Sequence, residues 1–263
     1  MPEGDTVHRA RVHLDRVLLG RELTRVELRV PSLAGTDLRG RTVESQHTHG
    51  KHLFTRLSGG IVLHTHLKMT GSWRVQRTPP PPGALIMGDD RIRVVLATAA
   101  GAAVGERVPV VELLTPEGER SVIARLGPDL LHPDFDVEQA CGRISAAPDR
   151  PISDALLDQT NLAGLGNFWV NELCYLRGVH PGAPTRSVAV EPLVRLAVRA
   201  LRQSAFTGPY QVTTGDTRSG RRCFVYGRER DCCLRCGSTI SQERSTPEQR
   251  HGWWCPRSQP SAS

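Results

Sequence analysis

The 263-residue chain has very few lysines, few aromatic residues and no long apolar run. Only Lys51 and Lys68 are lysines, so almost all of the 34 basic residues are arginines, whose planar guanidinium groups suit bidentate contact with phosphate. No apolar run reaches membrane-spanning length, and no charged-then-apolar leader comes before the predicted fold. We therefore expect a cytoplasmic protein without a membrane partner.

The cysteine content lacks the pattern of a disulfide framework. Seven cysteines are an odd number, and four of them lie close together late in the chain. This distribution favours a metal site or free thiols. With 34 basic and 27 acidic residues the net charge is +7, which favours an anionic partner, although a generic basic surface has the same balance.

The chain begins with Met1-Pro2-Glu3-Gly4-Asp5. Because Met1 precedes a small residue, we expect its removal, which leaves Pro2 with a secondary α-amine and Glu3 beside it. An α-amine titrates near ~8 and a lysine near ~10.4, so a useful fraction of this amine is unprotonated at neutral pH. An unprotonated amine that attacks a sugar or carbonyl carbon forms an iminium ion, which is covalent amine catalysis. Taken alone, the same residues are also typical of a simple helix start.

An amphipathic helix is predicted at residues 5–19, with Asp5 or Thr6 as its N-cap and Gly20 at its end. Seven short strands follow, separated by turn-forming residues: 22–30, 42–49, 51–57, 60–67, 72–75, 92–98 and 108–114. That number of strands indicates a two-sheet sandwich. A boundary is expected near 115–127. The pattern then becomes helical, at 136–146, 151–159, 167–177 and 190–206.

Lys51 lies between two predicted strands, where it is either a solvated turn residue or a cation for a phosphate. Five histidines surround it in the sequence: His47, His49, His52, His64 and His66. Within 61–69 the histidines share one strand face with Lys68, so a polar strand face explains them better than a metal site does. Met69, next to a glycine turn, is either a core residue or an exposed apolar wedge that enters a base stack.

A glycine-rich segment, Gly164-Leu165-Gly166-Asn167, precedes the helix expected at 167–177. Its glycines let backbone N–H groups face an anion, and the helix dipole adds to the attraction. We expect Asn167 to cap this helix. The pattern favours a phosphate clamp over a simple turn.

Cys233-Leu234-Arg235-Cys236 is a metal-type pair, and Cys255 follows after a gap of 18 residues. A zinc-ribbon hairpin needs a cysteine at position 258, where this chain has Ser258, and a serine hydroxyl is a poor zinc ligand. Alternatives for the fourth ligand are Cys232, Cys223, His251 or a water molecule, and a hairpin without metal is also open. Arg250 falls in the loop of that hairpin, as a phosphate or minor-groove probe or as a solvated residue.

Together these motifs resemble the formamidopyrimidine-DNA glycosylase and endonuclease VIII family of bacterial base-excision enzymes. The resemblance covers residues 2 to 258 in ordered motifs: Pro2-Glu3-Gly4, Gly50-Lys51-His52, His66-Leu67-Lys68-Met69-Thr70-Gly71, Ala155-Leu156-Leu157-Asp158-Gln159, Gly164-Leu165-Gly166-Asn167, Asn171-Glu172, Tyr226-Gly227-Arg228 and Trp254-Cys255-Pro256. Gly4-Asp5 is similar to the endonuclease VIII branch, in the form found in actinobacteria. Ser258 departs from the family's cysteine quartet.

The resemblance implies an α+β protein in three parts. A helix-led N-terminal β-sandwich forms the catalytic domain at 1–126, and a helix–two-turn–helix domain at 127–222 binds DNA. A zinc-finger-type β-hairpin with an incomplete cysteine quartet, together with a tail, occupies 223–263.

The resemblance also implies roles for single residues. Pro2 is the nucleophile that attacks C1′ of the damaged nucleoside, Glu3 is the acid that protonates the opening sugar, and Lys51 contacts phosphate and assists. Asn167 and Arg250 hold the phosphates that flank the lesion. Further residues are implied as follows: Met69 as the wedge that fills the gap left by the flipped base, and Cys233, Cys236 and Cys255 as zinc ligands, with Ser258 in a doubtful fourth position.

The implied activity is that of a bifunctional DNA glycosylase with AP-lyase activity in base-excision repair. It acts on oxidised bases, pyrimidines in particular, through a Schiff base on Pro2 and β- or β,δ-elimination. The implied partner is double-stranded DNA with an oxidised base or an abasic site, bound by a monomer at the nucleoid, with structural zinc and no redox cofactor. Two alternatives stay open: a damaged-DNA-binding protein without turnover, and a glycosylase that prefers 8-oxoguanine or formamidopyrimidine.

Overall fold

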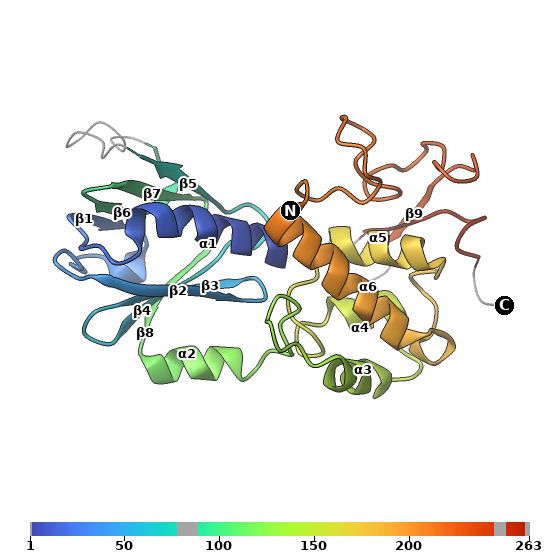
Figure 1. Cartoon of the computed structure of the whole chain (residues 1–263), viewed down its shortest axis with the longest axis horizontal. Helices are drawn as coiled ribbons and strands as arrows, with labels where there is room; N and C mark the ends of the chain where they lie inside the picture. Colours follow the sequence, from blue (N-terminus) through green and yellow to red (C-terminus); the bar gives the residue numbers. More distant parts are fainter. Residues whose placement is uncertain (1, 78–88, 245–250, 261–263) are drawn as a thin grey trace. The chain divides into compact units, whose positions relative to one another are not determined.

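The computed structural model describes residues 2–77, 89–244 and 251–260, which fall into two compact units, Met1–Arg125 and Leu126–Ser263 (Figure 1). Among these described residues, no helix is long and apolar enough to cross a membrane.

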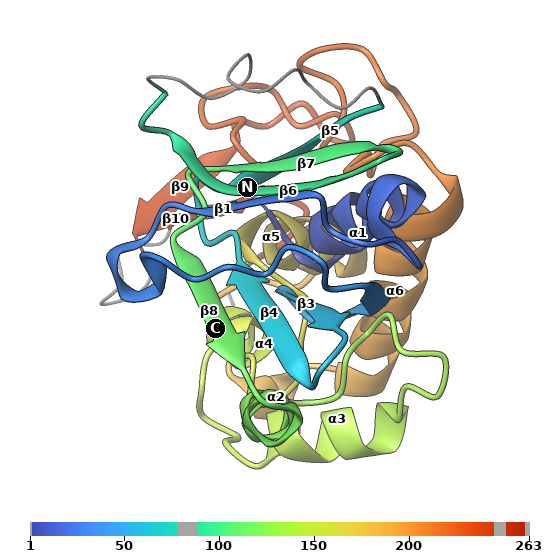
Figure 2. The ribbon, with the colours of Figure 1, turned by 90° about the vertical axis from the view of Figure 1, so that its left-hand side faces the viewer.

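The first unit contains two four-stranded antiparallel sheets, one in the order β1-β6-β7-β5 and the other in the order β2-β3-β4-β8 (Figures 1 and 2). The strands are β1 (Arg25–Leu28), β2 (Val43–His49), β3 (His52–Leu57), β4 (Ile61–His66), β5 (Ser72–Gln76), β6 (Ile92–Thr98), β7 (Gly101–Glu106) and β8 (Val110–Leu114). Their apolar side chains form a shared core, which confirms the predicted sandwich.

Helix α1 (Gly4–Leu18) contacts strands of both sheets. Val7, Leu14 and Leu18 recur on one face at helical spacing and lie in the sandwich core. The predicted N-cap was wrong by two or three residues, because Glu3 has the extended backbone of a cap. The Glu3 backbone N–H donates to the Thr6 hydroxyl over 3.0 Å, so Thr6 stabilises the helix start from inside its first turn.

One strand and one α-helix of the first unit were absent from the sequence prediction. Strand β7 pairs with β6 on one side and β5 on the other, although its sequence is mostly glycine and alanine. Helix α2 (Pro116–Ile123) occupies the segment expected to be a boundary, and the Thr115 hydroxyl caps it by accepting the Gly118 N–H over 3.1 Å. A short 3₁₀ turn spans Pro31–Leu33.

The second unit begins with four helices: α3 (Val137–Ser145), α4 (Ile152–Leu157), α5 (Asn167–Arg177) and α6 (Val190–Arg202). A 3₁₀ turn (Thr185–Ser187) precedes α6, and a π-helical turn (Gln203–Thr207) follows it. Residues of α6 at helical spacing, such as Leu193, Val194 and Ala197, are fully buried. They pack with Trp169 and Leu173 of α5 in a second core.

The second unit ends with a two-stranded hairpin of β9 (Ser241–Arg244) and β10 (His251–Trp254). A small cluster of buried side chains links this hairpin to α5 through Tyr175, Val225 and Trp253. A separate third domain from residue 223 stays a prediction.

Candidate functional site

The start of the chain is held tightly at the N-terminus of α1. Pro2 is partly buried, whereas the side chains of Glu3 and Asp5 are completely buried. Asp5 Oδ1 accepts the Thr6 N–H over 2.8 Å. Carboxylates at this end of a helix are favoured by its positive partial charge, so the cap fixes Glu3 next to the residue that would carry the α-amine.

Lys51 lies in the two-residue turn between β2 and β3, not in the strand predicted at 51–57. The turn begins with Gly50 at φ +56°, a left-handed conformation that favours glycine. The side chain of Lys51 is half-buried, and its positive charge is one cause of the lowered pKa of His66, after burial and Lys68. Lys51 therefore lies close to His66 at the end of β4.

The histidines form two rows across β2, β3 and β4. His47, Phe54, His64 and Glu112 are cross-strand neighbours in the first row. His49, His52 and His66 are neighbours in the second row, next to the turn of Lys51.

The strand face that bears these rows was predicted to be polar, but it is largely buried. His64 is 3% exposed and Phe54 is fully buried. His47 and His64 stack on the two sides of Phe54, at centroid distances of 5.2 and 4.9 Å. Ring stacking and hydrogen bonds thus replace the solvent contact that the polar pattern suggested, and these histidines form no group of three or more candidate metal ligands within the described residues.

Burial lowers the pKa of three histidines in these rows. Burial, followed by the effects of His66 and His64, lowers the pKa of His52 to about 3. Burial, followed by the charges of Lys68 and Lys51, lowers the pKa of His66 to about 4. Burial also lowers the pKa of His64, against the opposing effect of Glu112. These rings are neutral at physiological pH.

Met69 lies beyond the end of β4, in a turn that starts at Lys68 with φ +47°. The Gly71 N–H closes the turn by donating to the Leu67 carbonyl over 2.8 Å. Met69 is 68% exposed, so the interpretation of Met69 as a core residue was wrong. Of the two interpretations, the one that agrees with this exposure is an exposed apolar side chain.

Asn167 is the first residue of α5, not its cap, because Gly166 has the extended backbone of the N-cap position. The preceding loop is held by Gln159, whose Oε1 accepts the Gly164 N–H over 3.1 Å and whose Nε2 donates to the Leu165 carbonyl over 2.9 Å. Gly164 has φ +116°, which requires glycine. The loop thus has a defined path to the helix start.

Glu172 holds a segment that the sequence did not link to it. Its fully buried carboxylate accepts the backbone N–H groups of Phe224, Val225 and Tyr226, each over 2.8 Å, and the hydroxyl of Thr213. The single charged residue within the segment at 168–175 was the available sequence signal.

Asn171, on the same helix, holds β10. Asn171 Oδ1 accepts the Trp253 N–H over 2.7 Å, and Asn171 Nδ2 donates to the Asn167 carbonyl over 2.6 Å. Helix α5 thereby connects the start of its own first turn with the C-terminal hairpin.

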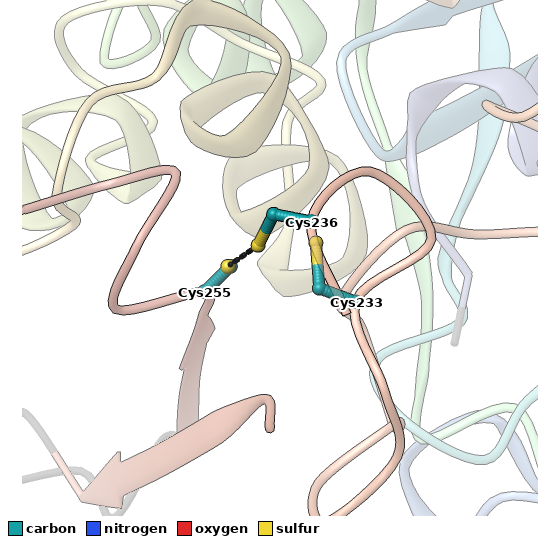
Figure 3. Close-up of side chains that lie close together, drawn as sticks. All are labelled: Cys233, Cys236 and Cys255. Carbon is teal, nitrogen blue, oxygen red and sulfur yellow. Dashed lines mark hydrogen bonds between the residues drawn. The ribbon is translucent and has the colours of Figure 1, made fainter. Parts of the chain in front are cut away.

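Cys233, Cys236 and Cys255 come together as predicted, with their three sulfur atoms within 4.8 Å of one another (Figure 3). Cys236 Sγ and Cys255 Sγ are 3.4 Å apart. Hydrogen bonds from Ser238 lower the pKa of Cys236 to about 6, which favours the thiolate form that binds metal. Although burial raises the pKa of Cys233, the Tyr175 hydroxyl and backbone N–H groups bring it below its usual value.

Ser258 Oγ lies 3.6 Å from Cys236 Sγ and 4.0 Å from Cys233 Sγ. A tetrahedral zinc ion with bonds of about 2.0–2.3 Å holds its ligand atoms roughly 3.5–3.8 Å apart. The three thiols and the Ser258 hydroxyl lie near this spacing, with Ser258 Oγ slightly farther from Cys233 than a bound zinc ion would hold it. The donor set fits a metal of this type.

Two of the other candidate fourth ligands, Cys232 and Cys223, do not join this cluster. Cys232 is exposed, and Cys223 Sγ instead donates to the Tyr226 carbonyl over 3.1 Å. Burial raises the pKa of Cys223 to about 11. Arg250 and the side chain of His251 lie outside the described residues.

Family models match two parts of the chain: the formamidopyrimidine-DNA glycosylase N-terminal domain at residues 1–107 and the H2TH domain of the same glycosylase at residues 126–205. "Probable endonuclease 8 2" of Streptomyces coelicolor is 43% identical, over 98% of this chain and 94% of its own length. The chain belongs to the formamidopyrimidine-DNA glycosylase and endonuclease VIII family. This confirms the resemblance described above.

Two further proteins match almost the full length of this chain. "DNA-(apurinic or apyrimidinic site) lyase Nei2" of Mycolicibacterium smegmatis is 42% identical, over 97% of this chain and 98% of its own length. The Lactococcus lactis Fpg, solved in complex with DNA containing an abasic site, has the same fold with a TM-score of 0.81 at 23% identity, over 98% of this chain and 99% of that chain.

Proposed function

We propose that this protein is a base-excision repair enzyme, a bifunctional DNA glycosylase with AP-lyase activity. The observation that carries the proposal is the fully buried Glu3 at the N-cap of α1, directly after Pro2, in a member of this family. A buried carboxylate beside a reactive amine can hold and deliver a proton without competition from bulk water.

The proposed reaction begins when the damaged nucleotide leaves the base stack, because its C1′ atom cannot be reached inside a duplex. The Pro2 nitrogen attacks C1′ and the C1′–base bond breaks with its electron pair on the base. Glu3 supplies the proton that opens the sugar. The resulting iminium ion on Pro2 acidifies the C2′ hydrogen, and loss of that proton expels the 3′ phosphate by β-elimination. The reaction either stops at β-elimination or continues with a δ-elimination that expels the 5′ phosphate. In both cases water hydrolyses the iminium ion and releases Pro2.

The proposed DNA contacts are distributed along the chain. Lys51 contributes a cation for phosphate from the β2–β3 turn, and the exposed Met69 fills the gap left by the extruded base. Asn167 at the start of α5 and Arg250 hold the flanking phosphates. The preferred lesions are oxidised pyrimidines, which the similarity to proteins named endonuclease 8 supports. Action on DNA places the enzyme at the nucleoid.

Zinc is the metal that we propose for the cysteine cluster. Cys233, Cys236 and Cys255 would hold it as thiolates, with Ser258 or a water molecule beside Ser258 at the fourth position. Its contribution is structural, since it would join the loop at 233–236 to the end of β10.

Borohydride trapping on DNA with an abasic site tests the proposal. The reduced complex should be covalent, and mass spectrometry of its peptides should place the DNA on Pro2, with Met1 absent. A Glu3→Gln variant should still trap on a preformed abasic site but should release oxidised bases about 10²–10⁴ times more slowly. Glu22→Gln, an exposed glutamate of the same unit, is the matched control.

The outcomes separate the alternatives. Binding of damaged DNA without trapping or cleavage, by protein that lacks Met1, would reject the enzyme and favour a damaged-DNA-binding protein. An adduct on Lys51 would reject Pro2 as the nucleophile. Faster release from 8-oxoguanine than from thymine glycol in competing duplexes would reject the pyrimidine preference.

A further inference from the structure

Three hydrogen bonds fix the side-chain amide of Asn171 between β10 and the start of α5. On one side, Asn171 Oδ1 accepts the Trp253 N–H over 2.7 Å. On the other side, Asn171 Nδ2 donates to the Asn167 carbonyl over 2.6 Å and to Asn167 Oδ1 over 3.1 Å. Asn171 is 2% exposed, so its amide has little contact with solvent. All of these residues belong to the second unit.

The orientation of both amides follows from one backbone group. The Trp253 N–H can only donate, so the Asn171 atom that faces it must be the oxygen, and the Asn171 NH₂ group must face Asn167. An NH₂ group also can only donate, so the Asn167 atom that meets it must be Oδ1. The Asn167 NH₂ group is thereby directed away from Asn171. Asn167 is partly exposed at the first position of α5, which is the end of a helix that attracts anions.

We propose that Asn171 is a positioning residue for the phosphate contact of Asn167, because it turns the Asn167 amide so that the NH₂ group, and not the oxygen, meets a DNA phosphate. The inference rests on the function proposed above, which assigns that contact to Asn167. Phosphate oxygens only accept hydrogen bonds, so an amide turned the other way would present an acceptor to an anion. The two orientations of an amide have nearly the same shape, so a hydrogen bond, and not packing, must select one of them.

The same contacts connect the Asn167 amide to β10. Trp253 lies in β10, so its N–H holds the Asn171 oxygen and thereby determines which way both amides point. The Trp253 indole is held separately, because its Nε1 donates to Glu229 Oε2 over 2.9 Å. A displacement of β10 would release the Asn171 oxygen and, with it, the orientation of the Asn167 amide. The backbone of β10 therefore acts on a phosphate contact at the far end of this hydrogen-bond chain.

The orientation can be measured without DNA. The chain has three asparagines, Asn161, Asn167 and Asn171, so ¹⁵N-asparagine labelling gives three side-chain NH₂ signals, which single variants assign. The Asn171 NH₂ group should exchange slowly with solvent and show a scalar coupling across its hydrogen bond to Asn167. Asn171→Asp keeps an acceptor for Trp253 but loses the donor, so it should shift the Asn167 NH₂ signal and leave the Trp253 amide protected. Asn171→Leu loses both and should also accelerate exchange at the Trp253 amide. An Asn167 signal that is unchanged in Asn171→Asp would overturn the proposal.

The effect on DNA is measured with a duplex that holds a tetrahydrofuran abasic analogue, which cannot form an iminium ion and so reports binding alone. Asn171→Asp should weaken binding about 10–100-fold, as expected when a hydrogen bond to a charged group is lost, and Asn167→Ala should weaken it to a similar extent. In the Asn167→Ala background, Asn171→Asp should add little. Gln139→Glu, which adds the same charge at an exposed residue of α3, is the control and should leave the affinity nearly unchanged. Independent, multiplicative losses from the two asparagine variants would overturn the proposal.

Binding and trapping separate this proposal from the proposed function. If the wild type binds the tetrahydrofuran duplex but does not trap on abasic DNA, the enzyme proposed above is rejected, and the binding of the variants still decides the role of Asn171. If Asn167→Ala binds the duplex like the wild type, Asn167 holds no phosphate and the positioning role of Asn171 is rejected. Covalent trapping by the wild type would still support the enzyme in that case.

Discussion

Ser258 is the residue at which this chain departs from a complete cysteine quartet, and its hydroxyl oxygen lies 3.6 Å from Cys236 Sγ and 4.0 Å from Cys233 Sγ. A neutral hydroxyl is a weak zinc ligand compared with a thiolate. The site should therefore bind zinc less tightly than four cysteines would, without losing the geometry.

Ser258→Cys should strengthen zinc binding, because it completes four thiolates at a position whose side chain already lies beside the three thiols. We expect stoichiometric zinc in the purified variant and release to a chelator at least about tenfold slower than in the wild type. Metal analysis and chelator competition measure both quantities. Cys232→Ser, at an exposed thiol outside the cluster, should change neither. Equal release rates for wild type and Ser258→Cys would show that position 258 does not reach the metal.

The residues of a site could be predicted from the sequence where their spacing alone indicates the chemistry. The cysteine trio is such a case, since the close pair and the later cysteine predicted which three sulfur atoms lie together. The histidine rows are the opposite case. Alternation placed His64 and His66 on one face, but only the packing of Phe54 shows that this face is buried and hydrogen-bonded.

At the scale of elements, α5 is the helix on which the described C-terminal segments depend. Glu172 receives three backbone N–H groups from residues 224–226, and Asn171 receives the N–H of Trp253. Hydrogen bonds to a buried charged group contribute about 1.5–3 kcal/mol each, so these contacts hold the segment more strongly than ordinary turn contacts.

Glu172→Gln should destabilise the second unit by about 2–4 kcal/mol, because the amide loses the charge and turns part of its acceptor capacity into a donor. Urea unfolding measures the loss, and hydrogen exchange should accelerate at the amides of Phe224, Val225 and Tyr226. Glu138→Gln, on the exposed face of α3, should leave both unchanged. Unaltered exchange at 224–226 in the Glu172 variant would contradict this view of the segment.

Most elements could be predicted because their apolar periodicity matches their burial. Helix α6 is an example, since Val190, Leu193, Val194 and Ala197 are all buried. Strand β7 could not be predicted, because glycine and alanine have little strand preference and only pairing with β5 and β6 sets its backbone. The cap of α1 was misplaced for a similar reason, as Glu3 is not among the usual cap residues.

At the scale of the whole molecule, the buried histidines make stability depend on pH. His52 and His66 have folded pKa values of about 3 and about 4, against 6.5 in the unfolded chain. Below pH 6.5 the unfolded state binds more protons than the folded state. The stability from these rings is therefore complete above pH 6.5 and is lost as the pH falls toward 4.

The free energy of unfolding should thus be lower at pH 5 than at pH 7.5, by at most about 2 kcal/mol for each of the two rings and by less because both are partly solvated. Urea unfolding at the two pH values measures the difference. His66→Gln should reduce this difference, whereas His13→Gln, at an exposed residue of α1, should not. A difference that is the same in His66→Gln and in the wild type would contradict the role of burial.

The cap of α1 has a practical consequence for handling the protein. Pro2 is the only residue between the expected cleavage point after Met1 and Glu3, whose side chain is buried at the cap of α1. The position of the Pro2 nitrogen is therefore restricted. A purification tag fused ahead of Pro2, or the few residues that a protease leaves behind, would convert the amine that we propose as the nucleophile into an amide. Recombinant material intended for activity assays should therefore carry its tag after Ser263.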